Sequence, residues 1–279
     1  MRLINGRAIA TALGGEIQTA ATALRAAGAP PALAVVVPTR DEATAWYVRT
    51  ITRTAAKVGI ECQVHQLDEP TGAEVARRLD VLSADPAVHG IVCQTPLPSG
   101  VSLGEVGAHI DPAKDVDGAN PLSLGRLTAG LAAFAPATAM AVLEILRREA
   151  IPFPGRRAVV IGRSIIVGKP VALLLLAANT TVTICHSHTV DLASISAAAD
   201  ILVVAIGRPH AIGIDHIRRG AVVIDVGTNP TPDGLTGDVD AGALADLDVA
   251  LTPVPGGVGP VTTMLLLRNT VDAAGRQGS

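Results

Sequence analysis

Aromatic residues are nearly missing from this 279-residue sequence, which has one Trp, one Tyr and two Phe. Because 49% of the residues are nevertheless hydrophobic, packing must rest on Leu, Val, Ile and Ala. Lysine is also scarce: Lys57, Lys114 and Lys169 are the only three, whereas arginine is plentiful. The lone tyrosine, Tyr47, therefore carries more information at a motif position than a tyrosine in an average chain.

Long apolar runs and a strong net charge are missing as well. No stretch reaches the roughly 18 uninterrupted apolar residues of a membrane span, and a net charge of −3 provides no basic field for nucleic acid. The first residues lack the layout of a secretory signal. The three cysteines are far apart, which fits reduced thiols, and His186 and His188 have no further ligand pair nearby. We expect a cytoplasmic protein without a metal and without nucleic-acid or membrane partners.

Helix-like and strand-like segments alternate along the chain. Helical spacing of apolar residues covers 7–27, 42–58, 71–84, 139–150, 168–178, 190–199 and about 261–274. Runs that predict strands are LAVVV, CQVHQL, GIVC, RRAVVIG, TVTIC, ILVVAIG and AVVIDVG. This alternation implies parallel sheets, and a Pro-, Gly- and Asp-rich passage at 111–136 separates two runs of it. We therefore expect an α/β protein of two domains, 1–138 with 261–279 and 139–260.

A glycine turn follows the first strand of the second domain and opens a helix. Gly162 and Gly168 flank this turn, and Ser164 stands where a GxGxxG motif has its middle glycine. In such a turn the backbone approaches a pyrophosphate at the N-terminus of a helix. A tight turn without a ligand is the alternative interpretation.

The next strand gives information about the cofactor. It ends in CHSH (185–188), without the acid that usually holds the ribose 2′-hydroxyl of NAD. Arg163 and Ser187 are able together to hold a 2′-phosphate. NADP is therefore expected in preference to NAD. Each of the two residues, taken alone, is also typical of an ordinary surface side chain.

Five segments resemble signatures of one enzyme family and occur in its order over nearly the whole chain. They are TPLP after Gln94, KDVDG at 114–118, GRSIIVGKP at 162–170, DVG at 225–227 and PVPGGVGP at 253–260. On these segments the sequence resembles the methylenetetrahydrofolate dehydrogenase/methenyltetrahydrofolate cyclohydrolase family. The resemblance implies an N-terminal αβα folate domain, a Rossmann-type NADP domain and a cleft between them. It also implies a reduced folate as substrate, NADP as cofactor and a homodimer.

The resemblance further assigns residues to the site. Tyr47 corresponds to the tyrosine that stacks on the folate, Gln94 to the glutamine that orients a catalytic lysine, and Asp117 to the acid that recognises the pterin. A carboxylate suits the adjacent N–H donors of an aminopyrimidinone. A core aromatic and a turn-capping acid are the alternatives for Tyr47 and Asp117. The other expected residues are Gly162, Arg163, Ser164, Gly168, Ser187 and Thr228 for the cofactor and Pro255, Gly256 and Gly257 for the folate.

The family's catalytic lysine is missing. The family has it one helical turn after the tyrosine, where this chain has Ile51, which cannot transfer a proton. A second departure is PATAMA at 136–141, where the family has PCTPxG. We therefore expect an NADP-dependent methylenetetrahydrofolate dehydrogenase with impaired or absent cyclohydrolase activity. One alternative is a folate-binding protein without turnover or with another substrate, and a further one is an ordinary bifunctional enzyme with a substitute group.

Overall fold

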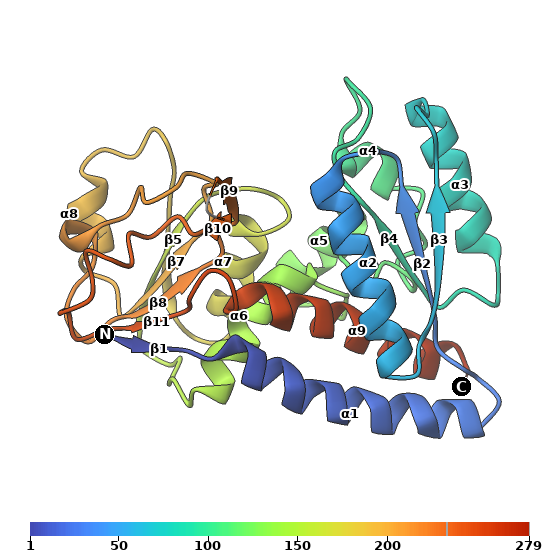
Figure 1. The fold of residues 1–279 in the computed structure, drawn as a ribbon, viewed down its shortest axis with the longest axis horizontal. Coiled ribbons are helices and arrows are strands. Elements are labelled where there is room, and N and C mark those ends of the chain that lie inside the picture. Colours follow the sequence, from blue (N-terminus) through green and yellow to red (C-terminus); the bar gives the residue numbers. More distant parts are fainter. Residues whose placement is uncertain (233, 279) are drawn as a thin grey trace. The chain divides into compact units, whose positions relative to one another are not determined.

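The structure, a computed structural model, describes residues 1–232 and 234–278. Its contacts divide the chain into two compact units (Figure 1). Unit 1 comprises Met1–Thr11 and Thr138–Thr262, and unit 2 comprises Ala12–Ala137 and Thr263–Ser279. The boundaries fall within the helices α1 (Gly6–Ala26), α6 (Ala137–Arg148) and α9 (Val258–Gln277).

Unit 2 is built around a parallel sheet with the strand order β3-β2-β4. Its further elements are β2 (Ala32–Val37), α2 (Glu42–Lys57), β3 (Glu61–Gln66), α3 (Gly72–Ala84), β4 (Gly90–Cys93), α4 (Leu103–Gly107) and α5 (Pro121–Thr128). Every residue of the central strand β2 is buried, as expected for a parallel strand covered on both faces. Val75 and Leu79 of α3 pack on the face that carries Ala34 and Val36.

Unit 1 contains a longer parallel sheet with the order β1-β11-β8-β7-β5-β6, beside an antiparallel pair β9-β10. Its further elements are β1 (Arg2–Leu3), β5 (Arg157–Ile161), α7 (Gly168–Ala177), β6 (Thr181–Cys185), α8 (Leu192–Ser196), β7 (Ile201–Val204), the 3₁₀ helix η1 (Ile214–His216), β8 (Val222–Asp225), β9 (Asn229–Thr231), β10 (Gly234–Thr236) and β11 (Ala250–Leu251). Its first long strand, β5, lies between β6 and β7. This is the doubly wound arrangement, in which the chain reverses direction beside the first strand. The expected α/β class with parallel sheets is confirmed.

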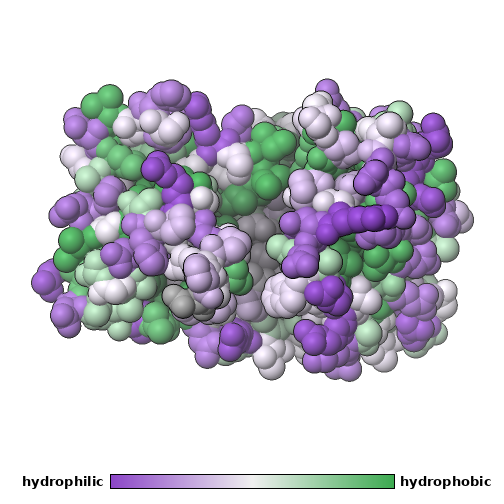
Figure 2. Space-filling view, turned by 45° about the horizontal axis from the view of Figure 1, so that its top comes forward, coloured by the Kyte–Doolittle hydropathy of each residue, from purple (hydrophilic) through white to green (hydrophobic). Residues whose placement is uncertain are grey.

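Aliphatic side chains fill the cores of both units, as the scarcity of aromatics requires. One cluster in unit 1 joins Val159 and Ile161 to Leu202 and Val204. Trp46, the largest side chain of the protein, is instead 57% exposed. Hydrophobic and hydrophilic residues are interspersed on the face drawn in Figure 2. Within the described part of the chain, no helix has the length and apolar character needed to cross a membrane.

Candidate functional site

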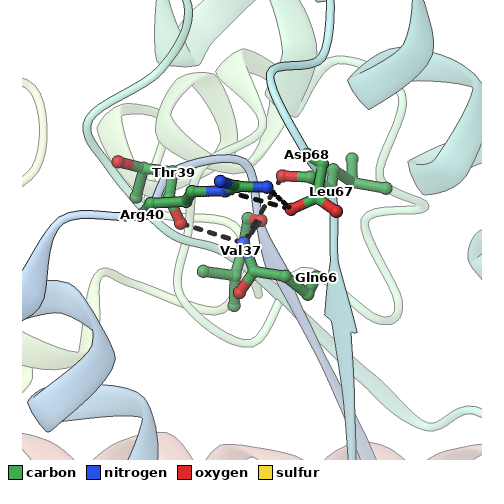
Figure 3. A network of polar contacts seen from close by, with 6 residues as sticks. All are labelled: Val37, Thr39, Arg40, Gln66, Leu67 and Asp68. Atoms are coloured by element: carbon green, nitrogen blue, oxygen red, sulfur yellow. Dashed lines mark hydrogen bonds and ion pairs between the residues drawn. The ribbon is translucent and has the colours of Figure 1, made fainter.

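A polar network at the ends of β2 and β3 fixes the loop that leads into α2 (Figure 3). The side-chain amide of Gln66 donates to the carbonyl oxygens of Val37 (3.1 Å) and Thr39 (2.9 Å). Arg40 forms an ion pair with Asp68 at 3.1 Å. Because this pair is exposed, it contributes little to stability. Together with the Gln66 contacts to the backbone, it links the loop before α2 to the end of β3.

The N-terminus of α2 is anchored to the loop that follows β4. Asp41 caps the helix by accepting the backbone N–H of Thr44 at 2.8 Å. The Thr44 hydroxyl donates to the carbonyl oxygen of Thr95, one residue after Gln94, at 2.8 Å. These contacts hold the first turns of α2, which carry Tyr47, at the carboxyl edge of the sheet, where open α/β sheets bind ligands.

The structure brings Tyr47 together with Asp117 and Thr263. Burial raises the pKa of the Tyr47 phenol, the negative charge of Asp117 raises it further, and a hydrogen bond with the Thr263 side chain partly offsets both. The phenol therefore remains protonated at neutral pH and is able to donate a hydrogen bond. Tyr47 as a whole is half-buried, unlike a fully enclosed core aromatic.

The two acids of the KDVDG segment have different surroundings. Asp115 is fully buried and accepts the N–H groups of Ala119 (2.8 Å) and Asn120 (3.0 Å) and the hydroxyl of Ser123 (2.6 Å). Asp115 is thus a structural acid that holds a turn. Asp117 accepts one backbone N–H, that of Ala137, at 3.0 Å through Oδ1. Its Oδ2 receives no hydrogen bond from the described residues, and burial raises the pKa of this carboxyl to about 6.

Gln94 and Ile51 lie on the elements expected of them. Gln94 follows β4, is 8% exposed, and donates its backbone N–H to the Val36 carbonyl at 2.9 Å. Ile51 is completely buried on the inner face of α2. Lys114 cannot replace the missing lysine, because its ammonium donates to the Asp85 carbonyl at 2.6 Å, before the amino end of β4.

The glycine turn of unit 1 has the geometry of a phosphate cradle. Gly162 has φ +126°, and a Cβ there would overlap the carbonyl oxygen of Ala205. A Cβ on Gly168 would overlap the carbonyl of Gly162. Both positions therefore require glycine. The Ser164 hydroxyl accepts the N–H of Val167 at 3.1 Å and that of Gly168 at 3.4 Å. Ser164 thus fixes the shape of the turn at the start of α7, where an anion is favoured.

Arg163 and Ser187 each lie two residues beyond the paired ends of β5 and β6. The two strands are in register at Ile161 and Cys185, and the Gly162 N–H donates to the Cys185 carbonyl at 2.9 Å. Both side chains are exposed, and neither has a hydrogen bond or ion pair with the described residues. They are therefore free to bind a ligand at this edge of the sheet.

The remaining expected residues also follow strand ends of unit 1. Thr228 is exposed and directly follows the DVG segment, whose first residue ends β8. Pro255 is exposed and Gly256 has φ +108°, which favours glycine. A Cβ on Gly257 would lie 2.6 Å from the Pro253 carbonyl oxygen. The turn at 255–257 is thus compact, with Pro255 exposed and Gly257 buried.

Sequence reasoning missed two groups of residues. Thr263, the hydrogen-bond partner of Tyr47, had no motif to indicate it. Asp225 and Asp238 form a buried carboxylate cluster in unit 1. Only Asp225 belongs to a motif of the sequence, the DVG segment. In the part of the chain that the structure describes, no group of three or more His, Cys, Asp or Glu side chains has the geometry to hold a metal ion.

Together, a glycine turn and a reversal of strand order in a parallel sheet define a dinucleotide-binding α/β protein. The comparisons identify the family. A model described as "Tetrahydrofolate dehydrogenase/cyclohydrolase, catalytic domain" matches residues 4–117, and the corresponding NAD(P)-binding domain matches residues 136–278. The chain belongs to the tetrahydrofolate dehydrogenase/cyclohydrolase family. The resemblance noted in the sequence and the expectation of a nicotinamide cofactor are confirmed.

Individual relatives agree over the full length. The chain is 61% identical to "Bifunctional protein FolD" of Parafrankia sp. (strain EAN1pec), covering 99% of this chain and 100% of the relative. A crystal structure of the bifunctional FolD enzyme of Campylobacter jejuni has a TM-score of 0.95 and 36% identity, covering 99% of both chains. The Trypanosoma brucei enzyme, complexed with NADP cofactor and inhibitor, has a TM-score of 0.93 and 37% identity, covering 98% of this chain and 97% of its own. The names of these relatives do not support the expected restriction to the dehydrogenase reaction.

Proposed function

We propose that the protein catalyses two steps on a reduced folate: NADP-dependent oxidation of 5,10-methylenetetrahydrofolate, and hydrolysis of the methenyl product. The observation that carries this proposal is the 61% identity, over nearly the whole chain, to a relative named as bifunctional. The proposed folate part comprises residues 1–138 and 261–279, and the proposed cofactor part comprises 139–260, although β1 at the start of the chain pairs with β11 in the sheet of unit 1. Separate assays of hydride transfer and methenyl hydrolysis with the purified protein test the two halves of the proposal.

The folate side of the proposal rests on Tyr47 and Asp117. The open Oδ2 of Asp117 offers an acceptor to the N–H edge of the pterin, and the protonated phenol of Tyr47 offers a ring face and a donor. In the absence of the lysine, Asp117 is also the best candidate for proton transfer. Its pKa of about 6 allows it to change protonation state near neutrality.

The cofactor side rests on the glycine turn and its neighbours. Gly162, Ser164 and Gly168 would hold the pyrophosphate, whereas Arg163 and Ser187 would hold the 2′-phosphate, with Thr228 at the end of β8. NADP⁺ supplies the hydride acceptor when it is bound. The contribution of the protein to this step is to hold the two reactants in a reactive geometry.

The first prediction concerns the choice of cofactor. NADP⁺ is expected to bind more tightly than NAD⁺, and Arg163→Ala to weaken NADP⁺ binding by about 1.5–3 kcal/mol, the value of a hydrogen bond to a charged group. Titration of both nucleotides against both proteins measures this. NAD⁺ is the internal control, since its affinity should not change in Arg163→Ala. Equal affinities of the original protein for the two nucleotides would contradict the assignment.

The second prediction concerns pH. A carboxylate accepts the pterin N–H groups only when ionised, so protonation of Asp117 competes with folate binding. Because its pKa is raised to about 6, folate affinity should fall as the pH drops below this value, by up to about tenfold per pH unit. The sign for folding is opposite: a raised carboxyl pKa favours the folded state at low pH, and this contribution is lost as the pH rises from about 4 to 6. Folate titrations between pH 5 and 8 test the binding part, and a flat profile would contradict it.

Ile51 favours a second candidate function, a dehydrogenase with weak hydrolase activity. Its buried aliphatic side chain has no proton to transfer, and general acid–base help is worth about 10²–10⁴-fold in rate. The hydride transfer depends less on such a group. The ratio of the two activities in one preparation distinguishes this candidate from the bifunctional one.

A cytoplasmic homodimer completes the proposal. The free thiols of Cys62, Cys93 and Cys185 are consistent with a reducing compartment. Edge strand β6 exposes Ile184, and Val190 after it is 77% exposed, so this edge of unit 1 offers apolar surface to a second copy. Light scattering on the purified protein measures the oligomeric state, and a monomer at micromolar concentration would contradict the dimer.

A further inference from the structure

Asp238 lies buried where several loops of unit 1 meet. It is fully buried, and its carboxylate accepts three consecutive backbone N–H groups, those of Ile206 (2.7 Å), Gly207 (3.0 Å) and Arg208 (2.8 Å). The side-chain amide of Asn229 donates to the same carboxylate at 2.9 Å. Both carboxylate oxygens are therefore fully used in holding loop 205–208 and the start of β9.

A second buried carboxylate holds Asp238 itself in place. Asp225 accepts the backbone N–H of Asp238 at 3.0 Å and that of Gly227 at 2.9 Å through Oδ1, and that of Val239 at 2.9 Å through Oδ2. A Cβ on Gly227 would overlap the Asp238 carboxylate, and one on Gly237 would overlap the Asp225 carboxylate. Two acids and two glycines thus fit together so closely that the cluster has a defined geometry.

The loop held by Asp238 contacts the glycine turn at the point where the strand order of the sheet reverses. Strand order reverses at β5, which has β6 on one side and β7 on the other. Ligands of such sheets bind at the carboxyl ends of the strands at this switch point. The glycine turn follows β5 and loop 205–208 follows β7, and Gly162 is in such close contact with Ala205 that a Cβ would not fit between them.

We propose that Asp238 is a positioning residue for the nicotinamide half of the dinucleotide, acting through loop 205–208. The adenosine half of a dinucleotide binds beside the second strand, here β6, because the group that reads its ribose follows that strand. The nicotinamide half therefore extends toward β7 and β8, where Asp238 holds the loops. This inference rests on the proposed NADP binding.

An ionised carboxylate suits this position better than any neutral side chain. Four N–H donors converge on its two oxygens, and hydrogen bonds to charged acceptors are the strong ones. An asparagine would turn an NH₂ group toward at least one of these donors, so that loop 205–208 must move away. The backbone of the glycine turn and the residues Arg163 and Ser187 would remain in place.

The test uses Asp238→Asn and two ligands, NADP⁺ and its adenosine fragment 2′,5′-ADP. The Kd of NADP⁺ is expected to rise by at least about tenfold, the loss of one good hydrogen bond or more, whereas the Kd of 2′,5′-ADP remains within about twofold. General loosening of unit 1 would weaken both ligands alike. Asp238→Asn with unchanged affinity for NADP⁺, or with equal losses for both ligands, would overturn the inference.

Asp200→Asn is the matched control. Asp200 also accepts a backbone N–H, that of Arg157 at 2.8 Å, and pairs with Arg218 at 2.9 Å, but it precedes β7 at the amino edge of the same sheet. This variant is expected to lower the thermal midpoint without changing the NADP⁺ to 2′,5′-ADP affinity ratio. If Asp238→Asn does not fold, Asn229→Ala, which removes one donor to Asp238, should raise only the Kd of NADP⁺, by about threefold. If the original protein binds neither ligand, the proposed cofactor fails rather than the role of Asp238.

Discussion

Replacing Asp117 with alanine is expected to reduce folate affinity by at least about a hundredfold while NADP⁺ affinity and the fold are retained. Two hydrogen bonds from the pterin to a carboxylate are worth about 1.5–3 kcal/mol each, so their loss accounts for an effect of this size. The structural cost is small, because the only hydrogen bond lost within the described residues is the one from the Ala137 N–H. Folate titration and thermal unfolding of the same preparation measure both quantities.

Asp111→Ala provides the control for this experiment. Asp111 lies in the same passage, is exposed and accepts the N–H of Ala113 at 2.9 Å. It should lose a little stability and no folate affinity. If Asp117→Ala behaved in the same way, Asp117 would be a turn acid like Asp115, and recognition of the pterin would have to be assigned elsewhere.

The long elements of the fold were predictable because their patterns are strong. Helix 42–58 was predicted from its apolar spacing, and α2 covers Glu42–Lys57. The last helix was predicted from about 261 but begins at Val258, because Pro260 lies in the first turn, where no intrahelical N–H bond is lost. Strands β1 and β11 have two residues each, too few for any periodicity to indicate them.

Site features whose residues lie close together in the sequence could be predicted, and those whose residues lie far apart could not. Local features were found: the glycine turn occupies seven consecutive residues, 162–168, and the missing acid after β6 lies only about 20 residues beyond it. The carboxylate cluster was not found, since Asp238 reaches residues 30–32 positions earlier. Tyr47 and Thr263 are more distant still. Such pairs are determined by the packing of strands and loops, and a single sequence carries no local signal for them.

Ile51→Lys is expected to raise the rate of methenyl hydrolysis by at least about tenfold, within the range of general acid–base catalysis. Position 51 lies one helical turn after Tyr47, so both side chains project from the same side of α2. Since Ile51 is completely buried, an amine there would be poorly solvated and its pKa lowered, which is what proton transfer near neutral pH requires. The same burial should lower stability by a few kcal/mol, about the cost of an incompletely paired buried polar group.

Ile51→Met separates the amine from a mere change of shape. Methionine is unbranched like lysine and adapts to irregular space, so it should leave hydrolysis unchanged, and both variants should retain NADP⁺ binding. Rates of hydride transfer and hydrolysis, measured on all three proteins, give the comparison. A folded Ile51→Lys protein without any gain would contradict the prediction and would indicate that the site has diverged further, through the altered 136–141 segment. If Asp117, whose pKa of about 6 permits proton transfer, supplies the proton in place of the lysine, Asp117→Asn should abolish hydrolysis even at saturating folate, because an amide cannot exchange a proton at this pH.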